Sequence, residues 1–308
     1  MPSTQLLSIR TFAVLAEDIK LAHSVFALPF ALLAAFMAAA PVDAALNWNR
    51  FSGQVALVLA AMVFARTAAM LANRWLDRNI DAANPRTAGR AIPAGRLSAP
   101  VAAGAWVVSA ISFTAVCAGF GLLYGNWWPL ALAGPVIVWI SAYGLLKRFT
   151  AWCHVYLGSS LAVSPLAAAI AIDPTSLAAQ PALWLLAVMV LFWVAGFDVL
   201  YALQDVDVDR RQGLYSLPAR MGAATAVRLS RLMHGLAGGA LIVAAVVDPR
   251  LMWLFGLGVV SVFALLCWEH LTILRWGTDR ITLAFFTLNG VISLLLGTLG
   301  IADVLLGT

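Results

Sequence analysis

The stretch that decides the fold runs from residue 53 to residue 81 and reads G-Q-V-A-L-V-L-A-A-M-V-F-A-R-T-A-A-M-L-A-N-R-W-L-D-R-N-I-D. Its apolar part, 53–72, is long enough for one helix to cross a bilayer, because about 20 residues span the hydrocarbon core. The polar end carries two carboxylates, Asp77 and Asp81, four residues apart. On a helix, side chains at this spacing lie on one face, with Cβ atoms about 5–6 Å apart. We therefore predict a membrane-spanning helix that ends in a carboxylate pair, and such a pair needs a cation.

The whole chain has the composition of a membrane protein. Of its 308 residues, 63% are hydrophobic and only 11% are charged, whereas soluble proteins contain about 25% charged residues. The apolar runs predict an all-α, polytopic membrane fold with about nine transmembrane helices around a central cavity, in a single domain covering residues 1–308. We expect these helices near residues 21–40, 53–72, 101–121, 127–146, 154–172, 181–203, 232–247, 251–268 and 281–302.

Lys and Arg residues are distributed unevenly between the two ends of these helices. Cytoplasmic loops are enriched in both residue types. One set of loops holds most of them, whereas the other set holds Arg50 and Arg250. This bias predicts that the N-terminus and both carboxylate-rich segments face the cytoplasm, in what we expect to be a bacterial inner membrane. The net charge of +5 follows from the same bias, so it indicates contact with anionic lipid headgroups and gives no case for nucleic acid. The sequence predicts no particular protein partner.

A second segment repeats the charge pattern of the first. Y-A-L-Q-D-V-D-V-D runs from Tyr201 to Asp209, and its carboxylates Asp205 and Asp209 are again four residues apart. Each segment follows a long apolar span, and the offset between them is 128 residues (209 − 81). We therefore predict a four-helix internal repeat with a ninth helix added. Membrane bundles built from repeats often place substrate at the repeat interface, so the two pairs would face each other. The alternative is a chance similarity of two helix ends.

Two carboxylate pairs at one membrane face suit Mg²⁺ and a diphosphate. Mg²⁺ prefers octahedral oxygen coordination and commonly takes one or two carboxylates together with substrate phosphates. Ions held in this way would neutralise the charge that develops as diphosphate leaves. The alternative is a pair of solvated helix ends. Asp207 points elsewhere and is expected either to be solvated or to lie behind the metal ligands, so it is left out of the metal set. The predicted magnesium ligands are Asn73, Asp77, Asp81, Asp205 and Asp209.

Two ionisable residues lie deeper in the same spans. Arg66 precedes Asn73 by seven residues, which puts both on one stripe of a helix, and Asp198 stands in the same relation to Asp205. A charge at this depth costs roughly 2.5–3.5 kcal/mol on insertion scales, so each should face the bundle interior and have a partner. We expect the Arg66 guanidinium to bind a carboxylate or phosphate of a substrate. The alternative is a structural ion pair between Arg66 and Asp198.

Lys147 and Arg148 end the fourth predicted span, in Y-G-L-L-K-R-F-T, on the same side as the aspartates. Most pairs of this kind are topological anchors. Because Tyr143 lies one turn earlier and a metal site is expected nearby, contact with a diphosphate is an equally good interpretation. The sequence leaves both interpretations open.

These residues resemble those of a known family, the UbiA superfamily of intramembrane aromatic prenyltransferases. N-R-W-L-D-R-N-I-D resembles its first aspartate-rich motif, N-x-x-x-D-x-x-x-D, and D-V-D-V-D resembles its second, D-x-x-x-D. Arg66, seven residues before the motif asparagine, and Y-x-x-x-K-R after the fourth span extend the resemblance over nearly the whole chain. Arg74 is a departure, because the commonest form of the first motif reads N-D-x-x-D and has an acid at this position.

The resemblance implies an Mg²⁺-dependent enzyme that transfers a polyprenyl group from a polyprenyl diphosphate to the ring of a hydroxylated aromatic acid. The expected acceptor is 4-hydroxybenzoate, in ubiquinone or menaquinone biosynthesis. The alternatives are another acceptor, such as a naphthoate or an intermediate of the futalosine route.

The resemblance also implies roles for individual residues. Arg66 and Asp198 are the expected catalytic residues, with Arg66 on the acceptor carboxylate and Asp198 near the acceptor. Lys147, with Tyr143 and Arg148, is expected to assist the magnesium ligands in binding the diphosphate. An ion-coupled transporter would also use intramembrane charges, but it has no reason to place two aspartate pairs at one membrane face.

Overall fold

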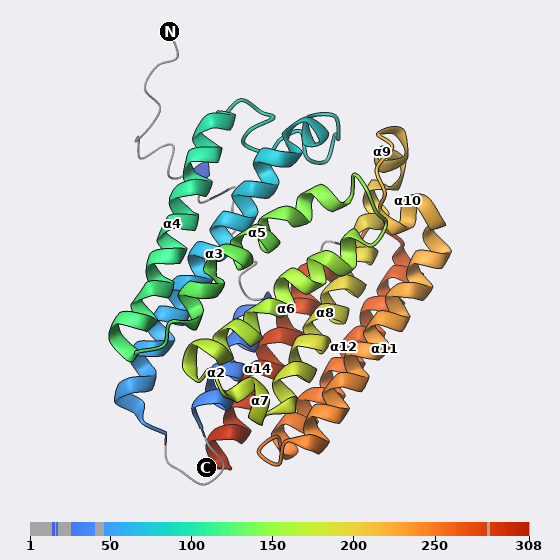
Figure 1. Ribbon diagram of the computed structural model, residues 1–308. Helices are drawn as coiled ribbons and strands as arrows, with labels where there is room; N and C mark the ends of the chain where they lie inside the picture. Colours follow the sequence, from blue (N-terminus) through green and yellow to red (C-terminus); the bar gives the residue numbers. More distant parts are fainter. Residues whose placement is uncertain (1–13, 16, 18–25, 41–45, 282–283, 308) are drawn as a thin grey trace.

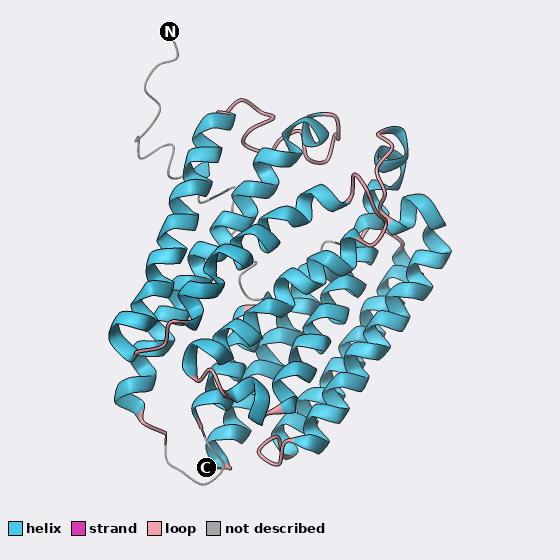
Figure 2. Cartoon of the chain, viewed as in Figure 1, coloured by secondary structure: helices cyan, strands magenta, loops and turns pink. Residues whose placement is uncertain are grey.

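The computed structural model describes residues 14, 15, 17, 26–40, 46–281 and 284–307. Within this part of the chain the regular structure is entirely helical (Figure 2). Among the described residues, eight helices are long and apolar enough to cross a membrane, which makes the chain an integral membrane protein. In chain order (Figure 1) the elements are α2 (Leu28–Ala39), α3 (Trp48–Ala82), α4 (Ala99–Tyr124), α5 (Trp128–Leu146), α6 (Cys153–Ile172), α7 (Ser176–Ala179), α8 (Pro181–Tyr201), η2 (Ala202–Asp205), α9 (Val206–Arg211), α10 (Leu217–Met221), α11 (Ala223–Val247), α12 (Trp253–Trp276), a π-helical turn η3 (Ala284–Leu288) and α14 (Asn289–Leu306).

The predicted all-α membrane fold is confirmed, and each predicted span overlaps a helix. The first span, 21–40, corresponds to α2, which is apolar but short; residues 21–25 of this span lie outside the described residues. The second span, 53–72, lies within α3, which continues to Ala82 and includes the whole first aspartate segment, as predicted for a helix that ends in a carboxylate pair. The central cavity, the four-helix repeat and the single domain over 1–308 stay predictions.

Helix α8 lies at the centre of one half of the bundle, between α6 and α11 (Figure 1). Glycines at the contacts allow the helices to approach closely, as small residues commonly do in membrane bundles. A Cβ added at Gly158 of α6 would collide with the backbone carbonyl of Leu191 in α8. A Cβ added at Gly196 of α8 would collide with the ring of His234 in α11. These contacts hold α8 in a fixed position, and its C-terminal end leads into the second aspartate segment.

Helix α3 packs along α4 and α5 in the other half, and α5 in turn contacts α6. The C-terminal end of α3 lies at the same end of the bundle as α9 and α10 (Figure 1). The fold therefore brings the two aspartate segments to one end of the molecule, as the charge distribution predicted.

At the opposite end of the bundle, a buried arginine links three segments of the chain. Arg250, in the connection between α11 and α12, is 3% exposed and forms an ion pair with Asp248 at 2.7 Å. Its guanidinium also donates to the Met37 and Ala40 carbonyls at the end of α2 and to Gln180 Oε1 before α8. Carbonyls in the last turn of a helix have no partner within that helix, so Arg250 caps α2 and ties it to α8.

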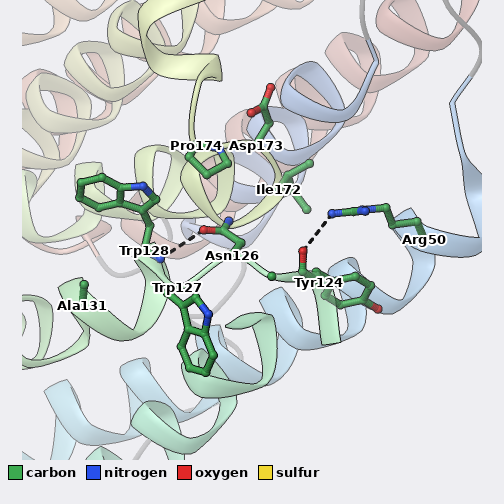
Figure 3. Close-up of a pocket in the computed structure, with 10 residues that line it drawn as sticks. Arg50, Tyr124, Asn126, Trp127, Trp128, Ala131, Ile172, Asp173 and Pro174 are labelled. Carbon is green, nitrogen blue, oxygen red and sulfur yellow. Dashed lines mark hydrogen bonds between the residues drawn. The ribbon is translucent and has the colours of Figure 1, made fainter. Parts of the chain in front are cut away.

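A cavity of about 730 Å³ also lies at this end (Figure 3). Arg50, Trp128 and Asp173 belong to its lining. Asn126, at its wall, donates to the Ile170 and Ala171 carbonyls at 2.8 and 3.0 Å and so caps α6. None of the predicted site residues lines this cavity.

Replacement of Arg250 by alanine is expected to destabilise the protein strongly. The change leaves the Asp248 carboxylate, which is 5% exposed, without its cation, and breaking a buried ion pair costs about 3–5 kcal/mol. Arg50→Ala is the matched control at the same end, because Arg50 is exposed and exposed arginines contribute about 1 kcal/mol or less. Thermal unfolding in one detergent measures both changes. Equal shifts of the unfolding midpoint would contradict the capping role of Arg250.

Candidate functional site

The first aspartate segment meets the basic end of α5. Asp77 is buried and forms ion pairs with Lys147 Nζ at 3.0 Å and with Arg148 at 3.2 Å. Asn73 Nδ2 donates to Asp77 Oδ2 at 3.0 Å. The close approach depends on Gly144 of α5, where an added Cβ would lie 2.7 Å from Asn73 Nδ2. The structure therefore brings together four predicted site residues from two helices.

The second carboxylate of this segment has a different partner. Asp81 is 3% exposed, and both of its oxygens accept from one nitrogen of Arg90, at 2.7 and 2.8 Å. Arg90 lies in the polar connection between α3 and α4. The carboxylate pair predicted on one helix face is thus present, but each member is already neutralised by a basic side chain.

The second aspartate segment departs from the predicted geometry. We expected Asp198, Asp205 and Asp209 on one stripe of a continuous helix, but α8 ends at Tyr201 and the 3₁₀-helical turn η2 follows. A 3₁₀-helix has three residues per turn instead of 3.6, so the stripe does not continue at its α-helical spacing. Asp205 ends η2, and Asp209 lies buried in α9. Asp207 is exposed, as a solvated residue should be.

The connection after α3 joins the two segments. Arg86 binds both oxygens of Asp205 in a bidentate ion pair, with Nε donating to Oδ1 at 2.9 Å. Asn84 Nδ2 also donates to Asp205 Oδ1, at 3.0 Å. Two further hydrogen bonds link the segment after α9 to the ends of α5 and α3. The Tyr215 N–H donates to the Lys147 carbonyl at 2.7 Å, and Gln212 donates to the Ile80 carbonyl. Residues that are far apart in sequence thus form one polar cluster, which we call the aspartate–arginine cluster: Asn73, Asp77, Asp81, Asn84, Arg86, Arg90, Lys147, Arg148 and Asp205.

The guanidinium of Arg86 stays protonated in this cluster. Burial disfavours the charged guanidinium, but its hydrogen bonds to Asp205 and the nearby Tyr201, Asp205 and Asp81 side chains outweigh burial and raise the pKa of Arg86 above its ordinary value. Arg86 also donates to the Tyr201 hydroxyl at 3.0 Å. A cation that binds carboxylates bidentately can bind phosphate oxygens in the same way.

Asp198 is held by a histidine. His154 Nδ1 lies 2.7 Å from Asp198 Oδ2, and the Leu217 N–H donates to His154 Nε2 at 3.2 Å. Because Nε2 accepts, the proton of a neutral imidazole must lie on Nδ1, which donates to the carboxylate. The structure therefore gives Asp198 a partner on α6 that the sequence did not suggest.

Arg66 and Tyr143 lie deeper than the cluster. Arg66 is partly buried in α3 and interacts electrostatically with Tyr143 of α5. Tyr143 in turn interacts electrostatically with both Asp77 and Asp198. Tyr143 is therefore near enough to Asp77 and to Asp198 to feel both charges.

The cluster fits Mg²⁺ together with a diphosphate, rather than Mg²⁺ alone. Among the residues that the structure describes, no group of three or more His, Cys, Asp or Glu side chains is arranged to hold a metal ion. Mg²⁺ needs only one or two carboxylates when substrate phosphates and waters complete its octahedron. The carboxylates are oxygen donors of the right kind, and the basic side chains that now neutralise them suit phosphate oxygens.

Sequence reasoning missed four residues of this region: Asn84, Arg86, Arg90 and His154. The basic connection after α3 was visible, but its arginines were explained by membrane orientation alone. That they reach back to both aspartate segments depends on how the connection folds. Nothing in the sequence linked His154 to Asp198, since a single histidine near a helix end can have many different partners.

Comparisons with known proteins agree on one family. The profile of the UbiA prenyltransferase family matches residues 27–291. The chain is 30% identical over 214 residues to "4-hydroxybenzoate octaprenyltransferase" of Stutzerimonas stutzeri (strain A1501), covering 69% of this chain and 68% of the relative. It is 29% identical over 214 residues to "4-hydroxybenzoate geranyltransferase 2" of Lithospermum erythrorhizon, covering 68% and 66%.

Solved structures share the fold. The apo structure of a UbiA homolog from Aeropyrum pernix K1 is 28% identical, with a TM-score of 0.78 over 91% of this chain and 98% of that one. A UbiA homolog from Archaeoglobus fulgidus, bound to GPP and Mg²⁺, has a TM-score of 0.68 at 17% identity, over 94% and 99% of the two chains.

Replacement of Gly144 by alanine is expected to weaken the binding of Mg²⁺ with inorganic diphosphate by about tenfold or more, because displacing a ligand side chain by an ångström is costly. The new Cβ would push Asn73 away from Asp77. Gly134→Ala is the control on the same helix, since its Cβ would meet no described atom within 4 Å. Isothermal titration calorimetry compares the two variants. Unchanged binding in Gly144→Ala would contradict the place of Asn73 in the site.

Proposed function

The chain belongs to the UbiA prenyltransferase family, and from this premise we propose that it transfers a polyprenyl group from a polyprenyl diphosphate to the ring of 4-hydroxybenzoate, in ubiquinone or menaquinone biosynthesis. The observation that carries the proposal is the aspartate–arginine cluster, in which two aspartate segments and the basic end of α5 meet at one end of the bundle. The printed names of the relatives support the acceptor.

The cluster would bind the diphosphate end of the donor. Asn73, Asp77, Asp81, Asp205 and Asp209 would hold Mg²⁺, which when bound supplies positive charge to the leaving diphosphate. The basic partners of these carboxylates would move their hydrogen bonds to phosphate oxygens as the donor enters. These partners are Lys147, Arg148, Arg86 and Arg90. Asp77, Asp81 and Asp205 would then keep a counter-charge throughout binding.

The aromatic acid would bind below the diphosphate. Arg66 precedes Asn73 by seven residues, about 10 Å along a helix at 1.5 Å per residue, so a carboxylate on Arg66 would lie deeper than the reacting carbon. Asp198, held by the Nδ1–H of His154 at 2.7 Å, keeps one oxygen available for the phenolic hydroxyl of the acceptor. A hydrogen bond from this hydroxyl to Asp198 would make the ring more electron-rich beside the hydroxyl.

The reaction then follows from these positions. The bond between the allylic carbon and the diphosphate oxygen breaks, and the diphosphate keeps the electron pair. The ring carbon beside the hydroxyl attacks the allylic cation, and loss of the proton from that carbon restores aromaticity. Tyr143, which interacts with both Asp77 and Asp198, would help to hold the two substrates together.

We further propose that the protein lies in the lipid bilayer of a bacterial inner membrane, with its N-terminus and its site facing the cytoplasm. The distribution of Lys and Arg supports this orientation. The shared position of both aspartate segments at one end of the bundle is consistent with it (Figure 1).

Purified protein in lipid is expected to form prenylated product from labelled 4-hydroxybenzoate, a polyprenyl diphosphate and Mg²⁺. Asp77→Ala and Asp205→Ala should abolish turnover, since each removes a carboxylate from the diphosphate end. Asp207→Ala is the control within the second segment, because Asp207 is exposed. Product analysis by chromatography decides the matter. A lack of product with every aromatic acid tried would contradict the proposed activity, and full activity of Asp77→Ala would contradict the metal site.

Replacement of Arg66 by alanine should raise the Michaelis constant for 4-hydroxybenzoate about tenfold or more, because a charge-assisted hydrogen bond contributes roughly 1.5–3 kcal/mol. The Michaelis constant for the prenyl diphosphate should change little, and it serves as the internal control. Steady-state kinetics with each substrate varied in turn measures both values. An unchanged acceptor constant would count against the binding of the carboxylate by Arg66.

A further inference from the structure

The contact between His154 and Asp198 joins a buried side chain to an accessible one. The His154 side chain on α6 is 4% exposed, whereas the Asp198 side chain on α8 is 24% exposed. Asp198 Oδ2 lies 2.7 Å from His154 Nδ1. The other oxygen, Oδ1, forms no hydrogen bond with the described residues and is not fully buried. One oxygen of the carboxylate is therefore fixed by a buried ring, and the other is accessible to a ligand.

The packing of α6 against α8 sets this contact. Gly158 lies one turn after His154, so both face the same side of α6. A Cβ added at Gly158 would collide with the Leu191 carbonyl and crowd the Ala195 nitrogen, both in α8. Asp198 follows Ala195 by three residues and shares its face of α8. The missing side chain at Gly158 thus lets the two backbones approach closely, one turn away from the pair.

A backbone N–H fixes the position of the proton on the His154 ring. The Leu217 N–H, at the start of α10, donates to His154 Nε2 at 3.2 Å. A backbone N–H can only donate, so Nε2 must provide a lone pair. The ring is therefore neutral with its proton on Nδ1, from which it donates to Asp198. Because both ring nitrogens are engaged, His154 can neither take up a proton nor release one without breaking one of these contacts.

Leu217 is itself held in place. Its side chain is fully buried and packs in one apolar cluster with residues of α8 and α11. Two residues earlier, the Tyr215 N–H donates to the Lys147 carbonyl at 2.7 Å. The segment that sets the proton of His154 is thus tied to the helix that carries Asp198 and to the basic end of α5.

The exposure of the two side chains distinguishes this pair from a purely structural one. In the pair of Arg250 and Asp248, which ties helix ends together, the side chains are 3% and 6% exposed, so neither is open to a ligand. In the pair of His154 and Asp198, only the histidine is buried to this degree. The accessible partner is the residue for which a contact with the acceptor is proposed, and the buried partner holds it.

We propose, on the basis of the function proposed above, that His154 is a positioning residue: its Nδ1–H, fixed by the Leu217 N–H, aims the free oxygen of Asp198 at the phenolic hydroxyl of the acceptor. Without this bond the carboxylate could rotate between staggered rotamers, and its free oxygen would have no fixed direction. As the ring attacks, positive charge develops on the ring and its hydroxyl, so the hydrogen bond to Asp198 becomes stronger. His154 therefore acts on kcat rather than on the binding of the acceptor.

Two variants of His154 that differ in hydrogen bonding more than in shape test the proposal. His154→Leu should lower kcat about tenfold or more, because the loss of a hydrogen bond to a charged group has this effect. The Michaelis constant for 4-hydroxybenzoate should change little, since Arg66 would still bind its carboxylate. His154→Asn is similar in size to the leucine variant but keeps an N–H near the position of Nδ1, and it should recover most of the lost kcat. Equal kcat values in the two variants would overturn the proposal.

A double-mutant cycle tests whether His154 acts through Asp198. In an Asp198→Asn background, His154→Leu should lower kcat by less than about a further twofold, because residues that act as one unit have non-additive effects. The same loss in both backgrounds would contradict an action through Asp198.

The proton position can be measured without turnover and without relying on a variant that folds. Nitrogen-15 NMR of the wild-type protein, labelled at its four histidines, should show a neutral ring protonated on Nδ1, and the spectrum of His154→Asn assigns this signal by its loss. A His154 ring protonated on Nε2, or on both nitrogens, would overturn the proposal. Product from the wild-type protein together with wild-type kcat in His154→Leu would overturn the positioning role alone, whereas a lack of product with every aromatic acid would overturn the proposed function itself.

Discussion

The ion pair between Arg86 and Asp205 is the contact on which the rest of the site depends. Arg86 follows the first aspartate segment, and Asp205 belongs to the second, more than a hundred residues later. With Asn84 beside it, Arg86 turns two separate helix ends into one surface. Because α3 and α8 belong to different halves of the bundle, this contact joins the two segments before a ligand binds.

The cluster also shows how a membrane protein keeps several carboxylates close together. Asp77 and Asp81 are nearly fully buried, and charges buried without a partner are costly. Each is therefore neutralised by basic side chains from another element: Lys147 and Arg148 from the end of α5, and Arg90 from the connection after α3. The same basic groups suit phosphate oxygens, so an incoming metal–diphosphate complex can replace these pairs without leaving a charge unpaired.

Much of this could be predicted from the sequence, because the signals are local. Apolar runs of sufficient length located the membrane helices, and the four-residue spacing located the carboxylate pair on α3. The prediction was wrong where it assumed a continuous helix from Asp198 to Asp209, since the 3₁₀-helical turn η2 interrupts it. It also missed Arg86, Arg90 and His154, because their partners are set by how connections fold back over the bundle, which residue spacing does not reveal.

The central claim is that the site is completed by its diphosphate ligand, since basic side chains hold its carboxylates beforehand. Calorimetric titration of the wild-type protein with Mg²⁺, in the absence and presence of inorganic diphosphate, tests this claim most directly. We expect weak binding of Mg²⁺ alone and binding at least about tenfold tighter with diphosphate, because phosphates then supply the missing ligands and draw the basic groups away. Equally tight binding of Mg²⁺ in the absence of diphosphate would contradict the account.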